Sequence, residues 1–155
     1  MNTSATVNKT IPTIVLGGTG YVAGELLRLI ATHPQLELAA AVSESQAGET
    51  IKSVFPHLQN VFGEQSYISR DEVGTHLHGK VAMFSAAPHG ASAAMIAELL
   101  ETAEKQDCEL TVVDASADFR FPTAAAYEAV YSHPHGAPHV LVHFSSGLPE
   151  HMGNP

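Results

Sequence analysis

The chain has 155 residues, 45% of them hydrophobic, and a formal net charge of −9 from 7 Lys and Arg against 16 Asp and Glu. This length fits one domain, which buries about 70% of its unfolded surface without a disulfide or a metal ion. The acidic balance argues against nucleic-acid and membrane partners, because both need clustered Lys and Arg. The single cysteine forms no internal disulfide, and no apolar run approaches the ~18 residues of a membrane span. We therefore expect a cytoplasmic location and a small-molecule ligand.

The first ten residues are polar and lack the apolar core of a signal peptide. We expect a disordered lead-in over residues 1–10 and one domain over residues 11–155. Apolar, β-branched runs predict strands at 13–16, 36–42, 80–85, 110–114 and 140–144, with a weak strand near 66–68. Apolar residues at helical spacing predict helices from Val22 to Ile30, near 49–54 and at 92–105. Residues 127–131 are expected to form the end of a further, short helix.

Strands that alternate with helices predict an α/β fold, namely a Rossmann-like, doubly wound, mostly parallel sheet with helices on both faces. Right-handed crossovers place every loop from a strand to a helix at one edge of such a sheet. We therefore expect four loops that are distant in sequence to line one crevice: residues 17–20, 43–48, 85–90 and 115–120.

The loop after the first strand reads Gly-Gly-Thr-Gly-Tyr-Val-Ala-Gly over residues 17–24. Gly17 suits a sharp turn from strand to helix, and Gly20 lets a diphosphate approach the backbone. Ala23, or Gly24 beside it, allows the helix to pack close to the sheet. The amides at the start of a helix attract an anion, so this loop predicts a dinucleotide site. The alternative is a tight turn without a ligand.

The loop after the second strand distinguishes between two forms of dinucleotide. An acidic residue there accepts a hydrogen bond from a ribose 2′-hydroxyl, whereas Arg accommodates a 2′-phosphate. Here the loop carries Glu44 between Ser43 and Ser45. If the Glu44 side chain points into the site, it would repel a 2′-phosphate. Either serine could donate a hydrogen bond to both forms of dinucleotide. The alternative is that Glu44 points outward and is solvated.

Several motifs occur in a characteristic order: the glycine loop, FPHL at 55–58, APHGAS at 87–92, DASADFR at 114–120 and GLPE at 147–150. Together they resemble the N-terminal, nucleotide-binding part of the N-acetyl-gamma-glutamyl-phosphate reductase family, which acts in arginine biosynthesis. The resemblance implies a two-step reaction in the full-length enzyme, which is expected to be a homo-oligomer. A cysteine thiolate first displaces phosphate from an N-acyl glutamyl phosphate, and hydride from NADPH then reduces the thioester to a semialdehyde.

The resemblance also implies roles for individual residues. The residues expected to hold the dinucleotide are Gly17, Thr19, Gly20, Tyr21, Val22, Ser43, Glu44, Ser45, Pro88, His89 and Gly90. Those expected on the substrate side are Ser116, Asp118, Arg120 and Glu150. For His89, acid–base chemistry is the alternative to lining the cofactor. For Arg120, the alternative is a salt bridge to Asp114 or Asp118.

The sequence departs from the family in three ways. Glu44 stands where the family carries Arg, so the cofactor is expected to be NADP with NAD left open, and Ser146 stands where the family carries Tyr. The family's nucleophilic cysteine and general-base histidine lie beyond Pro155, so no catalytic residue is assigned and this chain is expected to be inactive alone. Two other interpretations stay open: a self-contained dinucleotide sensor, and part of a related semialdehyde dehydrogenase.

Two further groups of residues invite a chemical interpretation. Cys108 lies between Asp107 and Glu109, whose charges raise a thiol pKa, so we expect no nucleophile there. Four histidines, at positions 133, 135, 139 and 143, lie in an irregular, proline-containing tail without a cysteine. We therefore expect no functional metal site.

Overall fold

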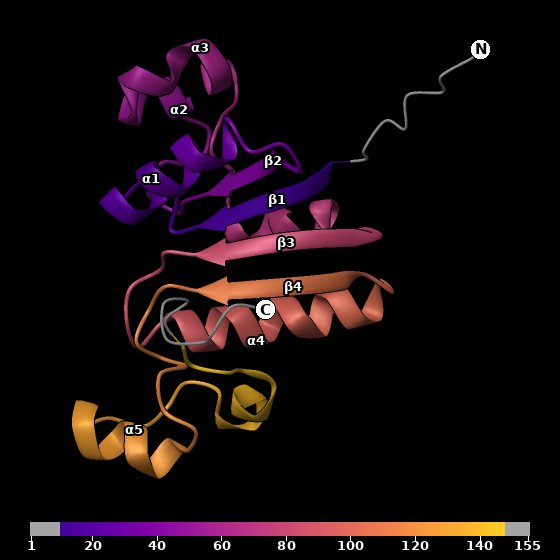
Figure 1. Cartoon of the computed structure of the whole chain (residues 1–155). Coiled ribbons are helices and arrows are strands. Elements are labelled where there is room, and N and C mark those ends of the chain that lie inside the picture. Colours follow the sequence, from indigo (N-terminus) through magenta and orange to yellow (C-terminus); the bar gives the residue numbers. More distant parts are fainter. Residues whose placement is uncertain (1–9, 148–155) are drawn as a thin grey trace.

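The computed structural model describes residues 10–147. Of the predicted lead-in over residues 1–10, only Thr10 lies within this range, and Glu150 lies outside it. Four strands form the sheet: β1 (Ile11–Leu16), β2 (Leu36–Val42), β3 (Lys80–Ser85) and β4 (Glu109–Asp114). They pair in the order β2-β1-β3-β4, and all three pairings are parallel. Figure 1 shows their carboxyl ends at the same edge of the sheet.

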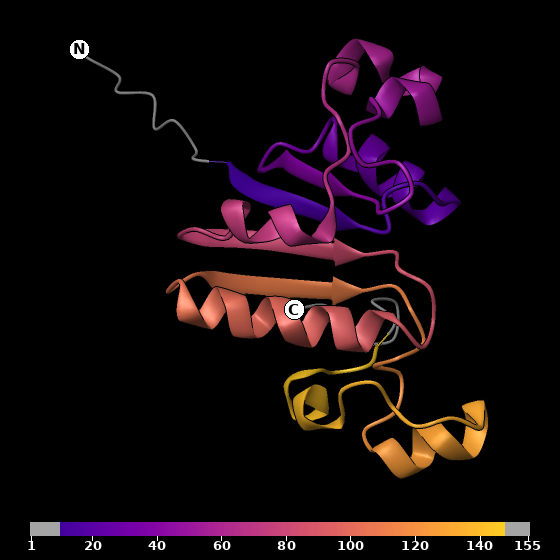
Figure 2. The ribbon, with the colours of Figure 1, turned by 180° about the vertical axis from the view of Figure 1, so that it is seen from behind.

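Helices and 3₁₀ turns connect the strands. In chain order these are α1 (Tyr21–Ile30), α2 (Ile51–Val54), η1 (Pro56–Leu58), α3 (Gln59–Phe62), η2 (Arg70–His76), α4 (Ser92–Lys105), α5 (Ala124–Tyr131) and η3 (Pro138–His143). Viewed from either side, α1–α3 lie beside β1 and β2, and α4 runs along β4 (Figures 1 and 2). No helix within residues 10–147 is long and apolar enough to cross a membrane.

The sheet has a separate hydrophobic core on each face, because successive residues of a strand point to opposite faces. Ile14 and Leu16 pack with residues of α4, η2 and η3 on one side. Val15, between them, packs with Ala23 and Leu27 of α1 on the other. Helices therefore cover both faces, which confirms the predicted doubly wound, Rossmann-like α/β fold.

The predicted strand at 140–144 is wrong. This segment forms η3, in which Val140 and Leu141 are both buried whereas Val142 is 81% exposed. Two adjacent buried residues do not fit a strand with one buried face, and Pro138 occupies the first position of the turn. The weak strand near 66–68 is reduced to two isolated bridges, Val42 with Ile68 and Thr50 with Ser66.

Candidate functional site

The four predicted loops meet at the carboxyl edge of the sheet. Backbone hydrogen bonds join three of these loops to the end of a neighbouring strand. Gly18 donates to the carbonyl of Val42 across 2.8 Å, and Ala86 donates to Leu16 across 2.9 Å. Ala115 donates to Ser85, also across 2.9 Å. These contacts fix the loops relative to each other before any ligand binds.

The glycine loop has two glycines that its geometry requires. Gly17 has a φ of +70°, and a Cβ there would lie 2.7 Å from the carbonyl oxygen of Ala86. A Cβ on Gly18 would lie 2.9 Å from Cε1 of Tyr67, whose buried ring supports the loop from below. Neither position therefore has room for a side chain. Gly20 differs, because a Cβ there meets nothing within 4 Å and faces open space.

The start of α1 has free hydrogen-bond donors. Gly20 is its N-cap, and no side chain caps the helix. The amides of Gly20, Tyr21 and Val22 have no acceptor within residues 10–147, and Tyr21 is 98% exposed. Unpaired amides and the positive end of a helix dipole match the chemistry of a diphosphate. The open space at Gly20 gives such an anion access to them, so this part of the site fits a dinucleotide.

The end of β2 carries the three polar residues predicted to meet the adenosine. Ser43 is buried, and its hydroxyl lies 3.4 Å from that of Ser45. Glu44 is exposed, but it is not simply solvated, because its Oε1 accepts a hydrogen bond from the backbone amide of Arg70 across 2.7 Å. The carboxylate is therefore held against the backbone at the start of η2.

The Pro88–Gly90 loop and the loop after β4 bind each other in both directions. The amide of Ala117 donates to Nδ1 of His89 across 2.9 Å. In return, Asp118 accepts from the amide of Gly90 through Oδ1 at 2.7 Å and from the amide of Ala93 through Oδ2 at 3.0 Å. Because Nδ1 of His89 is an acceptor, the neutral ring carries its proton on Nε2.

A chain of polar side chains, buried at Ser85 and Ser92 and half-buried at Asp114 and Ser116, lies under these loops, and the sequence analysis gave a site role only to Ser116. The hydroxyls of Ser85 and Ser92 lie 2.7 Å apart, and Ser92 donates to Oδ1 of Asp114 across 2.7 Å. The hydroxyl of Ser116 donates to the other oxygen of Asp114. Polar residues at Ser85 and Asp114, each the last residue of a strand, were the available signal. Ser92 gave none, because it occupies a buried position of α4.

Asp118 does not lie at the surface where a substrate could reach it. Its residue is only 1% exposed, and both carboxylate oxygens accept backbone amides. The Tyr127 hydroxyl lies 3.3 Å from Oδ1, and burial, followed by the negative charge of Asp118, raises the pKa of that tyrosine. His135 donates through Nε2 to the Asp118 carbonyl at 2.8 Å, because its Nδ1 accepts from Ala137. The Asp118 carboxylate therefore holds the two loops together, and it does not line the hollow at the end of β4.

Ser116 and Arg120 do share an open hollow of about 630 Å³ at the carboxyl end of β4, together with Phe119, Phe144 and Ser146. Arg120 donates from Nη1 to the hydroxyl of Tyr131 at 3.1 Å. The alternative salt bridge to Asp114 or Asp118 is not formed. The Arg120 guanidinium is therefore not neutralised by either carboxylate.

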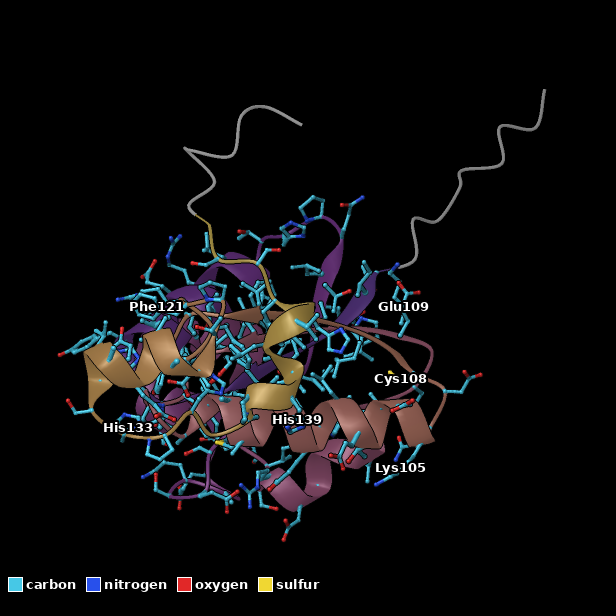
Figure 3. All side chains as sticks on the ribbon, turned by 90° about the horizontal axis from the view of Figure 1, so that it is seen from below. Lys105, Cys108, Glu109, Phe121, His133 and His139 are labelled. Atoms are coloured by element: carbon cyan, nitrogen blue, oxygen red, sulfur yellow. The ribbon has the colours of Figure 1, made fainter. Side chains whose placement is uncertain are left out.

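The two remaining candidates are Cys108, which lies away from this edge (Figure 3), and the four histidines at positions 133, 135, 139 and 143, which form no metal site. Burial, followed by the charge of Glu109, raises the pKa of the Cys108 thiol, as predicted. Figure 3 shows Cys108 beside Lys105 and Glu109, at the opposite end of α4 from His133. Within residues 10–147, no three His, Cys, Asp or Glu side chains are grouped to hold a metal ion.

A parallel, doubly wound sheet with uncapped amides after its first strand defines the class of dinucleotide-binding α/β domains. Comparison with known families supports this class and narrows it to one family. The model described as "Semialdehyde dehydrogenase, NAD binding domain" matches residues 13–144. The chain therefore belongs to this family of nicotinamide-dinucleotide-binding domains.

Two curated relatives from different bacteria have the same name. The chain is similar to the N-acetyl-gamma-glutamyl-phosphate reductase of Pseudomonas putida (strain W619), with 40% identity over 136 residues. It is also similar to the protein of that name from Acetivibrio thermocellus, with 36% identity over 138 residues. In both cases the alignment covers 88% of this chain and 37% of the relative. The chain thus spans little more than a third of the length of these relatives.

Proposed function

We propose that this chain is the dinucleotide-binding part of an N-acetyl-gamma-glutamyl-phosphate reductase, an oxidoreductase that reduces an acyl phosphate to a semialdehyde. The names of the relatives support this substrate class. The uncapped amides at Gly20, Tyr21 and Val22 are the observation that carries the binding part of the proposal. A cytoplasmic location, homo-oligomeric assembly and a role in arginine biosynthesis belong to the same proposal.

In this proposal the dinucleotide, when bound, supplies the hydride. The amides of residues 20–22 bind its diphosphate, and Ser43 and Ser45 meet the adenosine ribose. The Pro88–Gly90 loop faces the nicotinamide half, because the sheet order places it on the far side of β1 from β2. The sequence resemblance implies NADP(H), and Glu44 leaves NAD(H) open.

The substrate side of the proposal rests on the hollow at the end of β4. Arg120 offers a planar cation that suits a carboxylate or a phosphate, and Ser116 lines the same hollow beside Asp114, to which its hydroxyl donates. Asp118 contributes indirectly, because it holds the Pro88–Gly90 loop against the loop that carries Ser116 and Arg120. We propose Glu150 as a further substrate-side residue from the resemblance alone.

Dinucleotide binding is tested by titrating the 155-residue chain into NADH and NADPH and following nicotinamide fluorescence. ADP-ribose should compete, because it retains the diphosphate that the free amides bind. Adenosine and nicotinamide, which lack the diphosphate, should not compete at the same concentration. Absence of binding by both dinucleotides, or equal competition by adenosine, would contradict the proposal.

The substrate side is tested separately with N-acetylglutamate, a stable analogue that carries a carboxylate in place of the acyl phosphate. Calorimetry in the presence of saturating dinucleotide should show binding that Arg120→Gln weakens. Arg28→Gln is the matched control, because Arg28 is paired with Glu25 on α1, away from the hollow. Equal affinities for the wild type and Arg120→Gln would remove Arg120 from the substrate site.

A further inference from the structure

The adenosine end of the site carries a negative charge held in place at the rim. Glu44 is the second residue after β2, and its Oε1 accepts from the Arg70 amide at 2.7 Å. That amide is itself positioned by the sheet, because Ile68 forms a parallel bridge with Val42. The other carboxylate oxygen has no partner within the described residues. The charge is thus oriented, and it retains a free acceptor.

A 2′-phosphate at the end of β2 would need a nearby cation, and the structure offers none that is unpaired there. Of the 7 Lys and Arg, Lys9 lies outside the described residues, which leaves six. Five of these six have a carboxylate partner within 4.0 Å. The sixth is Arg120, which lies in the hollow at the end of β4.

Arg70 is the cation nearest in sequence to the contact with Glu44, and its side chain lies elsewhere. Its backbone amide binds Glu44, but its Nη1 lies 3.8 Å from Oε2 of Glu98, on α4. The guanidinium is therefore directed to the helix that covers one face of the sheet. A 2′-phosphate would meet a carboxylate and two serine hydroxyls, without a compensating positive charge.

We infer that Glu44 makes this site select the dinucleotide that lacks a 2′-phosphate, so that NAD(H) binds more tightly than NADP(H). The inference rests on the proposed dinucleotide function and revises its cofactor. The free oxygen of Glu44 is an acceptor for a ribose hydroxyl, and its charge repels a phosphate at the same place. Ser43 and Ser45 can donate to either form and do not discriminate.

The experiment compares dissociation constants for NADH and NADPH by fluorescence titration of the 155-residue chain and four variants. In the wild type, NADH should bind about tenfold more tightly than NADPH. Glu44→Arg should shift the ratio toward NADPH by at least about tenfold. Glu44→Gln should shift it in the same direction by less, because the amide oxygen still accepts from the Arg70 amide while the charge is gone.

Two controls locate the effect. Glu49→Arg makes the same change of charge at an exposed residue further along the loop, and should leave the ratio within about twofold of the wild type. Arg70→Gln should also leave it unchanged, because the inference assigns no phosphate contact to that side chain. Added salt should narrow the difference between the two dinucleotides in the wild type more than in Glu44→Gln, because ions screen the repulsion.

The outcomes separate this inference from the function on which it rests. A ratio that is identical in the wild type, Glu44→Gln and Glu44→Arg would overturn the inference and leave dinucleotide binding intact. Tighter binding of NADPH by the wild type, lost in Arg70→Gln, would also overturn it, because Arg70 would then supply the missing cation. Failure of the folded wild type to bind either dinucleotide would overturn the proposed function and this inference with it.

Discussion

The backbone amide of Ala117 donates to Nδ1 of His89 across 2.9 Å, although the two residues are 28 positions apart. This contact and the reverse contact from Gly90 to Asp118 fasten two loops of the carboxyl edge to each other. The loops follow β3 and β4, which are neighbours in the sheet. Their mutual hydrogen bonds therefore convert an alignment set by the strands into a fixed arrangement of side chains.

Asp118→Asn should destabilise the protein strongly. Asp118 accepts two backbone amides with its two oxygens, whereas an asparagine offers one oxygen and would set its NH₂ group against an N–H. Because the side chain is buried, water cannot compensate. We expect a loss of about 2–4 kcal/mol in the free energy of unfolding, measured by urea denaturation.

Asp71→Asn is the control for that experiment, because Asp71 is exposed in the first turn of η2. Its free energy of unfolding should stay within about 0.5 kcal/mol of the wild type. If Asp118→Asn were equally mild, Asp118 would not be holding the loops together.

Two substitutions of His89 should distinguish the role of Nδ1 in stability from the role of Nε2 in dinucleotide binding. Nδ1 accepts from Ala117, and Nε2 carries the proton that we propose faces the dinucleotide. His89→Asn places an amide oxygen close to the position of Nδ1, so it should retain the stability of the wild type and bind dinucleotide more weakly. His89→Ala should lose both, with a cost of about 1 kcal/mol for the missing hydrogen bond. Thermal denaturation and fluorescence titration measure the two effects, and unchanged affinity in His89→Asn would assign the residue to loop structure alone.

The sequence predicted the sheet and the convergence of its loops because both follow from periodicity and from the handedness of crossovers. It could not predict the burial of Asp118, since a motif shows which residues lie at the edge but not which way each side chain points. The strand predicted at 140–144 was wrong for a related reason. Its apolar residues pack under α4 as a 3₁₀ turn, and a short apolar run does not distinguish that packing from a strand.

Tyr67→Phe should stabilise the protein, and the gain should grow at alkaline pH. The hydroxyl of Tyr67 is buried without a hydrogen-bond partner in the described part of the chain, so its removal should gain about 1 kcal/mol at neutral pH. Burial also raises the pKa of Tyr67 to about 12. In the unfolded chain the pKa of a tyrosine has its ordinary value of 10.0, so the unfolded state releases the proton first as the pH rises.

The stability of the wild type should therefore fall between pH 10 and 12 by up to about 1.4 kcal/mol per pH unit through this group alone. Phenylalanine removes that contribution, so the difference between the two proteins should widen over this interval. Tyr21→Phe is the control, because a side chain that is 98% exposed should show no such widening. Parallel stability curves for the wild type and Tyr67→Phe above pH 10 would contradict the assignment.

Alanine at Gly17 and at Gly20 should have opposite consequences, although both glycines belong to the same loop. At Gly17 an added Cβ meets the carbonyl of Ala86 at 2.7 Å in a left-handed conformation, so Gly17→Ala should lose about 2–4 kcal/mol of stability. At Gly20 the same atom meets nothing within 4 Å, and its φ of −83° suits any residue. Gly20→Ala should therefore cost no more than about 1 kcal/mol, the scale of an altered N-cap.

For dinucleotide affinity the order should be reversed: among folded proteins, Gly20→Ala should lose more affinity than Gly17→Ala. The methyl group at residue 20 occupies the space through which a diphosphate would reach the amides, so Gly20→Ala should weaken binding by at least about tenfold. Circular dichroism measures folding, and fluorescence titration measures binding to the folded fraction. A Gly20→Ala protein that binds dinucleotide as tightly as the wild type would show that the open space beside α1 is not where the diphosphate lies.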